Sequence, residues 1–260
     1  MAGSFMPRLQ TLHLINVQSD LSAVESSKGT CNNNASVLLP RLQTLFLQDI
    51  GRDLLRLILC SIAPGPYRIV INLADARSFH SIWKHQDCLP EDSLSTVPLF
   101  LEEFNITMLM IEEGWMSGAA LHKLLGKLPN LEALSIGYRD IDVEILQALV
   151  RPIYYNVRDC NMNFPILSRL HFLYSAFDRH NLNMLKDVVV SHGIQELVIV
   201  GTKREYLDQP VKSFVYLENS ENDQFTTLIK EWLRSSVPKF ILANSLKDVP
   251  DCYNFQTHIW

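Results

Sequence analysis

The segment PRLQTLHL at residues 7–14 returns as PRLQTLFL at residues 40–47, with seven of the eight positions identical. A looser form of this pattern, P-x-L-x-x-L-x-L, occurs at residues 129–136 and 165–172, and weaker copies begin near residues 66, 105 and 193. The last leucines of each copy alternate with other residues, which is typical of a strand with one buried face. The copies therefore predict repeated units that each open with a short strand.

Helices are predicted between these strands because apolar residues recur there at helical spacing. Residues 119–128 place four leucines on one helical face, and residues 50–62 form a similar stretch before Pro64 and Gly65. Short side chains with an acceptor oxygen cap the first turn of a helix, and glycine ends one. The residues expected to begin or end the helices are Ser117, Asp140 or Asp142, Asp178, Gly193, and Asn222 or Asp223.

The unit of strand, turn, helix and turn resembles the leucine-rich-repeat family, and it is most similar to the degenerate arrays of fungal F-box/leucine-rich-repeat proteins. The resemblance spans roughly residues 7–242 and is carried by the two PRLQTL copies. It implies an α/β leucine-rich-repeat solenoid, a ribonuclease-inhibitor-like horseshoe with irregular repeats of about 25–38 residues. Such repeats usually keep Asn or Cys three positions after the last strand leucine. This chain has Val17, Ile50, Arg139 and Ser175 there, so we expect an irregular array.

One repeat domain is expected over residues 1–245, with a C-terminal tail at residues 246–260. Residues 16–36 are rich in Ser and Asn and are predicted to form a loop, and residues 74–98 form an insertion. An F-box is a separate helical module that normally precedes the repeats in that family, but the first repeat here begins at Pro7. We therefore expect the chain to be the repeat portion of a longer protein, or to work without the adaptor contact.

Two other interpretations stay open. Alternating strands and helices could also form a doubly wound α/β sheet, which would favour an enzyme of unknown reaction, and the chain could be a structural scaffold. Doubly wound sheets have glycine at the switch point and continuous strands of Val and Ile. This chain has 39 leucines but only 10 glycines, and it repeats one leucine spacing. These counts favour the repeat array.

Composition excludes several classes of protein. Hydrophobic residues make up 47% of the chain, which is too many for a disordered protein. The net charge is −5, with 23 basic and 28 acidic residues and no basic run, so no nucleic-acid partner is expected. No signal peptide and no apolar stretch long enough for a membrane span occur, which predicts a cytoplasmic or nuclear protein without a membrane contact. The five scattered cysteines are expected to be reduced.

A binding surface can be predicted from strand alternation, since residues between the leucines face away from the helices. The predicted middle row of this concave face is His13, Phe46, Asn72, Met110, Ser135, His171 and Val198. The face has few charges and many apolar residues, which suits a protein partner. Alternatively, insertions could pack over its centre, near Met108 and Met110. The residues predicted to bind the partner are Thr11, His13, Thr44, Phe46, Gln48, Asn72, Met110, Arg169, His171 and Glu196.

No catalytic, cofactor-binding or metal-binding residue is predicted. The densest set of metal-ligand types, His80, His85, Asp87 and Cys88, lies in one insertion without a second cluster to complete a zinc site. The adjacent pairs Glu102-Glu103 and Glu112-Glu113 point to opposite faces of a strand, so neither pair can act on one bond. The glycines at 114 and 118 lack the third glycine and the lysine of a phosphate loop, and no G-x-S-x-G elbow occurs.

The sequence therefore predicts a noncatalytic protein–protein interaction module that binds a protein partner on its concave face. By resemblance, the module would recognise substrates for a cullin-type ubiquitin ligase. Contact with the ligase adaptor is expected only if an F-box lies upstream.

Overall fold

The computed structural model describes residues 8–17, 37–48, 50, 52–63, 65–73, 101, 104–111, 117–137, 140–152, 164–201, 214–215, 217 and 224–244. Nearly all of the predicted loop at residues 16–36 lies outside these ranges, as do the predicted insertion at 74–98 and the tail at 246–260. The candidate metal ligands His80, His85, Asp87 and Cys88 and both glutamate pairs also lie outside the described residues.

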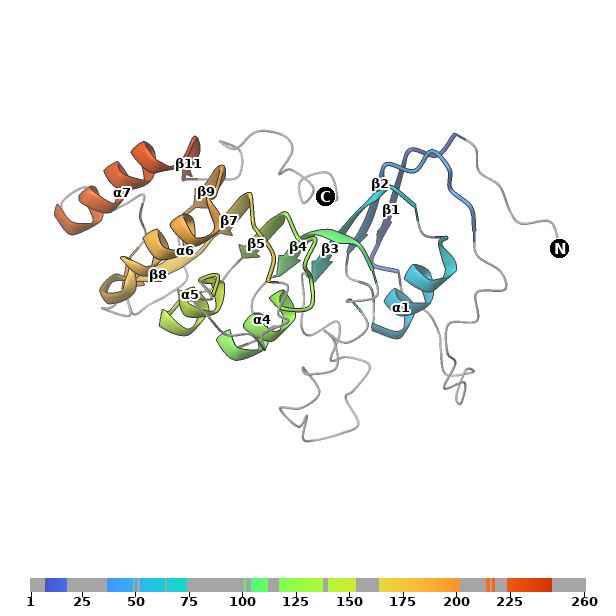
Figure 1. Cartoon of the computed structure of the whole chain (residues 1–260), viewed down its shortest axis with the longest axis horizontal. Helices are drawn as coiled ribbons and strands as arrows, with labels where there is room; N and C mark the ends of the chain where they lie inside the picture. The colour runs from blue at the N-terminus through green and yellow to red at the C-terminus, as the bar shows by residue number, and fades with distance from the viewer. Residues whose placement is uncertain are drawn as a thin grey trace.

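Eight strands form one large sheet, in which every neighbouring pair is parallel and the spatial order follows the chain (Figure 1). These strands are β1 (Thr11–Ile15), β2 (Thr44–Gln48), β3 (Arg68–Leu73), β4 (Ile106–Ile111), β5 (Ala133–Gly137), β7 (Arg169–Leu173), β9 (Glu196–Val200) and β11 (Lys239–Ala243). The two near-identical sequence copies pair in register, Thr11 with Thr44 through Ile15 with Gln48. The repeated strands that the sequence predicts are therefore confirmed as neighbours.

Five helices connect these strands within the described ranges: α1 (Arg52–Ser61), α4 (Gly118–Leu125), α5 (Val143–Leu149), α6 (Met184–His192) and α7 (Gln224–Ser236). A second sheet contains β6 (Asp140–Ile141), β8 (Ala176–Asp178) and β10 (Phe214–Val215). In this sheet β6 and β8 are parallel, whereas β8 and β10 are antiparallel. The helices predicted from apolar spacing are thus present, although α6 begins at Met184, later than the predicted start at Asp178.

The leucine spacing predicts a horseshoe solenoid with repeats of about 25–38 residues, and this prediction is wrong. The described residues form instead an open α/β protein with an eight-stranded parallel sheet and five helices. Successive strands of the sheet start between 24 residues (Thr44 to Arg68) and 43 residues (Glu196 to Lys239) apart, so no constant unit repeats. Leucine at alternate positions indicates a strand packed on helices, which any parallel α/β sheet provides.

The strand order also differs from that of a typical doubly wound sheet. The strands of the large sheet follow their order in the chain from one edge of the sheet to the other, without a reversal. Doubly wound proteins bind ligands at the point where the strand order reverses. Within the described strands this sheet has no such switch point, so we expect a ligand site on a sheet face or along a sheet margin.

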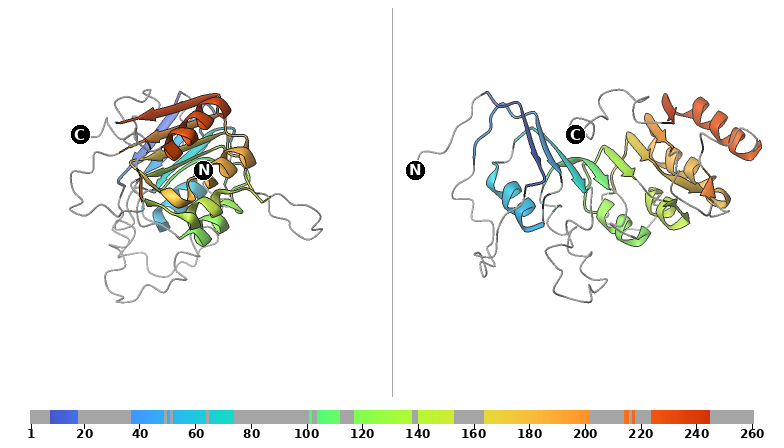
Figure 2. Two further views of the ribbon diagram at one scale, coloured as in Figure 1. Left: turned by 90° about the vertical axis from the view of Figure 1, so that its left-hand side faces the viewer. Right: turned by 180° about the vertical axis from the view of Figure 1, so that it is seen from behind.

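The two faces of the large sheet are covered differently (Figures 1 and 2). On one face, strand residues such as Leu45, Leu109 and Leu170 form the main core together with residues of all five helices, among them Leu124 and Leu185. The opposite face carries a separate cluster, whose buried members all come from strands: Met110, Leu173, Val198, Val200 and Ala243. We call this second face, on which no described helix packs, the helix-free face.

Several predicted helix ends are confirmed in detail. The side chains of Ser117 and Asp142 each accept a hydrogen bond from a first-turn N–H of α4 and α5. Gly193 ends α6 in the left-handed region, with φ +65°. Asp178 caps the short 3₁₀ turn Arg179–Asn181 rather than α6, which is a correction of the predicted start.

Helices α4 and α5 pack so closely that one position accepts only glycine. A Cβ built on Gly118, at the start of α4, would lie 2.3 Å from the carbonyl oxygen of Glu144 in α5. Real atoms do not approach to this distance, so a larger residue would force the helices apart. Gly118 therefore serves helix packing.

Cys60, on α1, is disulfide-bonded, which corrects the expectation that its thiol is reduced. The other four cysteines lie outside the described residues. Of the helices in the described ranges, none has both the length and the apolar character that crossing a membrane requires.

Candidate functional site

Strand register decides which side chains stand side by side on the helix-free face. One row across the sheet reads His13, Phe46, Val70, Met108, Ala133, Arg169, Glu196 and Lys239. The next row reads Ile15, Gln48, Asn72, Met110, Ser135, His171, Val198 and Ile241. The predicted row that joins Phe46 to Asn72 is wrong, because Phe46 pairs with Val70. The reason is that β3 begins two residues after Pro66, whereas β2 begins four residues after Pro40.

All ten residues predicted to bind a partner lie on strands of the helix-free face, but their exposure differs sharply. Thr11 and His13 are exposed, and Thr44, Arg169 and Glu196 are half-buried. The other five are buried: Phe46, Gln48, Asn72, Met110 and His171. The centre of this face is thus closed to solvent, so any contact with a partner must be made near its edges.

The buried centre contains a pair of polar side chains on neighbouring strands. Ser135 Oγ, on β5, lies 2.9 Å from Nδ1 of His171, on β7, and the two side chains are 2% and 1% exposed. Burial, together with the nearby positive charges of Arg169 and Lys239, lowers the pKa of His171 to about 3. His171 is therefore neutral at neutral pH.

A serine beside a histidine invites comparison with a nucleophile and its base, but three observations speak against it. Neither side chain is accessible to a substrate, and a histidine with a pKa of about 3 is a poor general base at neutral pH. The carboxylate that would orient the ring is too far away, because Glu196 Oε1 lies 3.9 Å from His171 Nε2, beyond hydrogen-bond range. The pair is better explained as a polar contact within the core.

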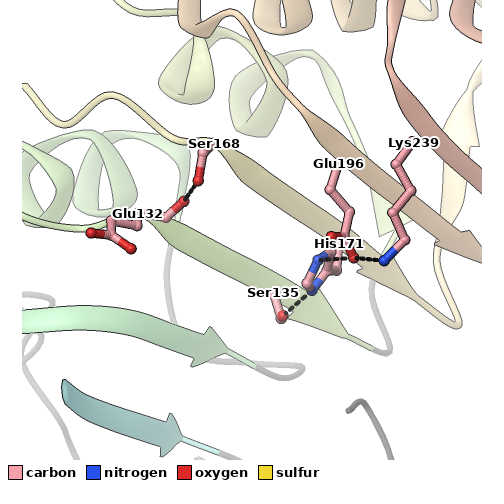
Figure 3. A network of polar contacts seen from close by, with 6 residues as sticks. All are labelled: Glu132, Ser135, Ser168, His171, Glu196 and Lys239. Carbon is pink, nitrogen blue, oxygen red and sulfur yellow. Dashed lines mark hydrogen bonds and ion pairs between the residues drawn. The ribbon is translucent and has the colours of Figure 1, made fainter. Parts of the chain in front are cut away.

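A string of charged side chains, Glu132, Arg169, Glu196 and Lys239, runs from this pair along the margin where the strands begin. Figure 3 shows Lys239 on β11 beside Glu196 on β9, and Lys239 Nζ lies 3.1 Å from Glu196 Oε1. Arg169 on β7 is the cross-strand neighbour of Glu196. Arg169 also lies 3.9 Å from the carboxylate of Glu132, just before β5. Negative and positive charges therefore alternate across four strand ends, and Glu132, Arg169 and Lys239 are 55%, 35% and 48% exposed.

The charged string meets an open groove of about 640 Å³ at Glu132. We call it the proline groove, because Pro129 and Pro152 line it, together with Asn105, Thr107 and the exposed side chain of Ile166. Its mixture of amide, hydroxyl and apolar groups suits a peptide backbone with an apolar side chain. An open, polar groove does not enclose a small cofactor.

Buried His192 holds two walls of the proline groove together. Its Nδ1 accepts a hydrogen bond from the Leu167 N–H at 3.2 Å, and its Nε2 lies 2.7 Å from the Leu149 carbonyl oxygen. Leu167 follows the lining residue Ile166, and Leu149 closely precedes Arg151, which also lines the groove. Burial lowers the pKa of His192, so the ring is the neutral tautomer that donates from Nε2.

Sequence reasoning missed Glu132, Lys239 and His192 as site residues. Lys239 could have been found from alternation at residues 239–243, which places it on the same face as Glu196. Nothing local marks His192, whose partners come from other elements 25 and 43 residues away. Among the described residues, no group of three or more His, Cys, Asp or Glu side chains could hold a metal ion.

Comparison with known proteins assigns no relative: no family model, no curated protein and no solved structure matches the chain.

Proposed function

We propose that the protein is a noncatalytic interaction module that binds an extended segment of a partner protein. The segment would lie along the margin of the helix-free face, from the proline groove across Glu132, Arg169, Glu196 and Lys239. The alternating, partly exposed charges of this string are the observation that carries the proposal. Surface ion pairs contribute little to stability, so a row of them beside a groove is available for recognition.

The chemistry of the margin argues for a polypeptide rather than a small molecule. The four charges of the string balance, so they select a partner whose own charges alternate in sign, and amide and hydroxyl groups in the groove can form hydrogen bonds with its backbone. The exposed Ile166 and the two prolines form an apolar surface on which one side chain of the partner can pack. Together these features give specificity through charge and orientation through hydrogen bonds.

The proposal is tested by selecting peptides from a displayed library against the wild-type chain. The selected peptides are then measured against the double variant Arg169→Gln/Lys239→Gln by fluorescence anisotropy. We expect their affinity to fall about tenfold, since two partly screened charged contacts are lost. The matched control is Lys123→Gln/Arg234→Gln, which removes two exposed positive charges on α4 and α7 and should leave the affinity unchanged. Failure to select any peptide, or equal loss in both double variants, would overturn the proposal.

The noncatalytic part of the proposal has its own test at Ser135. A fluorophosphonate probe, which labels activated serine nucleophiles, should leave Ser135 unlabelled at neutral pH, because its neighbour His171 is a weak base. Labelling that disappears in Ser135→Ala would show an activated nucleophile, and the protein would then be an enzyme.

The ligase role implied by the family resemblance stays a prediction. It requires that a cullin adaptor binds the natural protein through an F-box outside the described sheet. Pull-down of purified adaptor by the chain of residues 1–260 should fail, and pull-down by a longer product with an F-box should succeed. If the natural protein has no F-box-like helices, the ligase role loses its support.

A further inference from the structure

A second groove lies at the opposite end of the same margin, where β1, β2 and β3 begin. It measures about 680 Å³, and its lining includes Gln10, Pro40, Arg41, Gln43, Pro66 and Arg68. We call it the arginine groove. The proline groove and the charged string lie at the starts of later strands and share no residue with the arginine groove. A proposal for the arginine groove therefore does not rest on the proposed function.

Both arginines are held on fixed backbone. Arg41 precedes Leu42, which is 3% exposed and belongs to the main core, and Arg68 follows Tyr67, which is also buried. The strand starts are tied together, since the Gln43 N–H donates to the Gln10 carbonyl oxygen at 2.7 Å and the Arg68 N–H donates to the Gln43 carbonyl oxygen at 2.9 Å. The two exposed guanidinium groups therefore project from a backbone that is held in place by these hydrogen bonds and by the buried neighbours.

The positive charge of this groove has no counterpart in the described structure. No aspartate or glutamate occurs among the described lining residues, and neither Arg41 nor Arg68 forms an ion pair within the described part of the chain. Arg8 occupies the position of Arg41 in the preceding sequence copy and adds a third positive charge at these strand ends. Like charges on neighbouring strands repel, so the arrangement is unfavourable until an anion joins them.

We propose that the arginine groove binds an acidic peptide segment, with carboxylates on the guanidinium groups of Arg41 and Arg68. Guanidinium groups match carboxylates in planar, bidentate geometry. The side-chain amides of Gln10 and Gln43 can donate to and accept from a peptide backbone, which favours a polypeptide over a free anion. The groove volume lies within the usual range of ligand sites.

The test uses a fluorescein-labelled hexaglutamate peptide, with hexaglutamine as the uncharged comparison, and measures binding by anisotropy at low and physiological ionic strength. Hexaglutamate should bind and hexaglutamine should not. Arg41→Gln and Arg68→Gln should each weaken hexaglutamate binding about fivefold, and the double variant should abolish it. Both side chains are exposed, so these variants should keep the wild-type thermal midpoint.

Arg234→Gln, on the exposed surface of α7, makes the same change in net charge far from the groove and should bind hexaglutamate as the wild type does. Equal weakening in Arg234→Gln would show unspecific attraction and overturn the proposal. The proposal also fails if inorganic phosphate or an oligothymidylate displaces hexaglutamate at concentrations below the peptide's own dissociation constant, since the groove would then prefer phosphoryl groups. If Arg169→Gln/Lys239→Gln lost binding and Arg41→Gln did not, the acidic peptide would bind at the charged string, and the proposal for the arginine groove would fail.

Discussion

Ser135 Oγ and His171 Nδ1 lie 2.9 Å apart on neighbouring strands, although the two residues are 36 positions apart in the sequence. Both are almost fully buried on the face of the sheet that has no described helix. This contact places a neutral histidine at the inner end of a charged string. The stability of the sheet should therefore depend on pH through this residue.

Mild acid should destabilise the protein because of His171. In the unfolded chain a histidine takes up a proton near pH 6.5, whereas the folded pKa is about 3. Between these values the unfolded state binds more protons, so the free energy of unfolding falls as pH falls and is fully retained only above pH 6.5. We expect a loss of about 2 kcal/mol between about pH 7 and pH 5, measured by urea unfolding.

The matched comparison for this pH dependence uses two histidine variants. His171→Gln cannot titrate and should lose about 2 kcal/mol less than the wild type over the same pH range. His180→Gln changes an exposed histidine and should keep the wild-type slope. Identical slopes in His171→Gln and the wild type would assign the acid sensitivity to other groups.

His192→Leu should destabilise the protein by about 2–4 kcal/mol. Leucine fills the space but leaves the Leu167 N–H and the Leu149 carbonyl oxygen without their partner. His122→Leu is the control, because His122 is only half-buried and its one described backbone contact is 3.4 Å long. Chemical unfolding should show a clearly larger loss for His192→Leu. Equal losses would mean that His192 acts through packing alone.

Gly118→Ala should cost about 2–3 kcal/mol, because the new methyl group would collide with the backbone of Glu144. Gly193→Ala is a useful comparison, since a Cβ there meets no atom within 4 Å and only the left-handed backbone opposes it. That strain costs about 1 kcal/mol. Thermal unfolding of both variants would check the order, and a Gly118→Ala chain as stable as the wild type would disprove the close helix packing.

Asn72→Leu should stabilise the protein by about 1–2 kcal/mol, because a buried amide without partners costs desolvation free energy. Asn72 is 1% exposed, and neither its Nδ2 nor its Oδ1 has a hydrogen-bond partner in the described part of the structure. Ser135→Ala breaks the bond to His171 instead and should destabilise the fold. A less stable Asn72→Leu chain, measured in urea, would indicate that a bound group satisfies this amide.

The sequence predicted the local elements well and their assembly poorly. Strands at the leucine copies, the helices, and the ends at Ser117, Asp142 and Gly193 all form, because alternation and capping depend on neighbouring residues. The fold class was wrong, because alternating leucines are common to every strand packed on helices. The row through Asn72 was misaligned by two residues, because the turn before β3 is shorter than the one before β2.

By itself the sequence determined where the strands of the large sheet form, roughly where the helices lie, and which residues lie on the helix-free face, since periodic apolar residues mark the buried side of an element. Tertiary structure alone decided how far that face is buried, which brought His171 to Ser135 and left Arg169 and Lys239 partly exposed. The two grooves also depend on tertiary structure, because each is lined by residues at the starts of several strands. The physical reason is that burial, ion pairs and cavities depend on the distance between chain segments, which local periodicity does not contain.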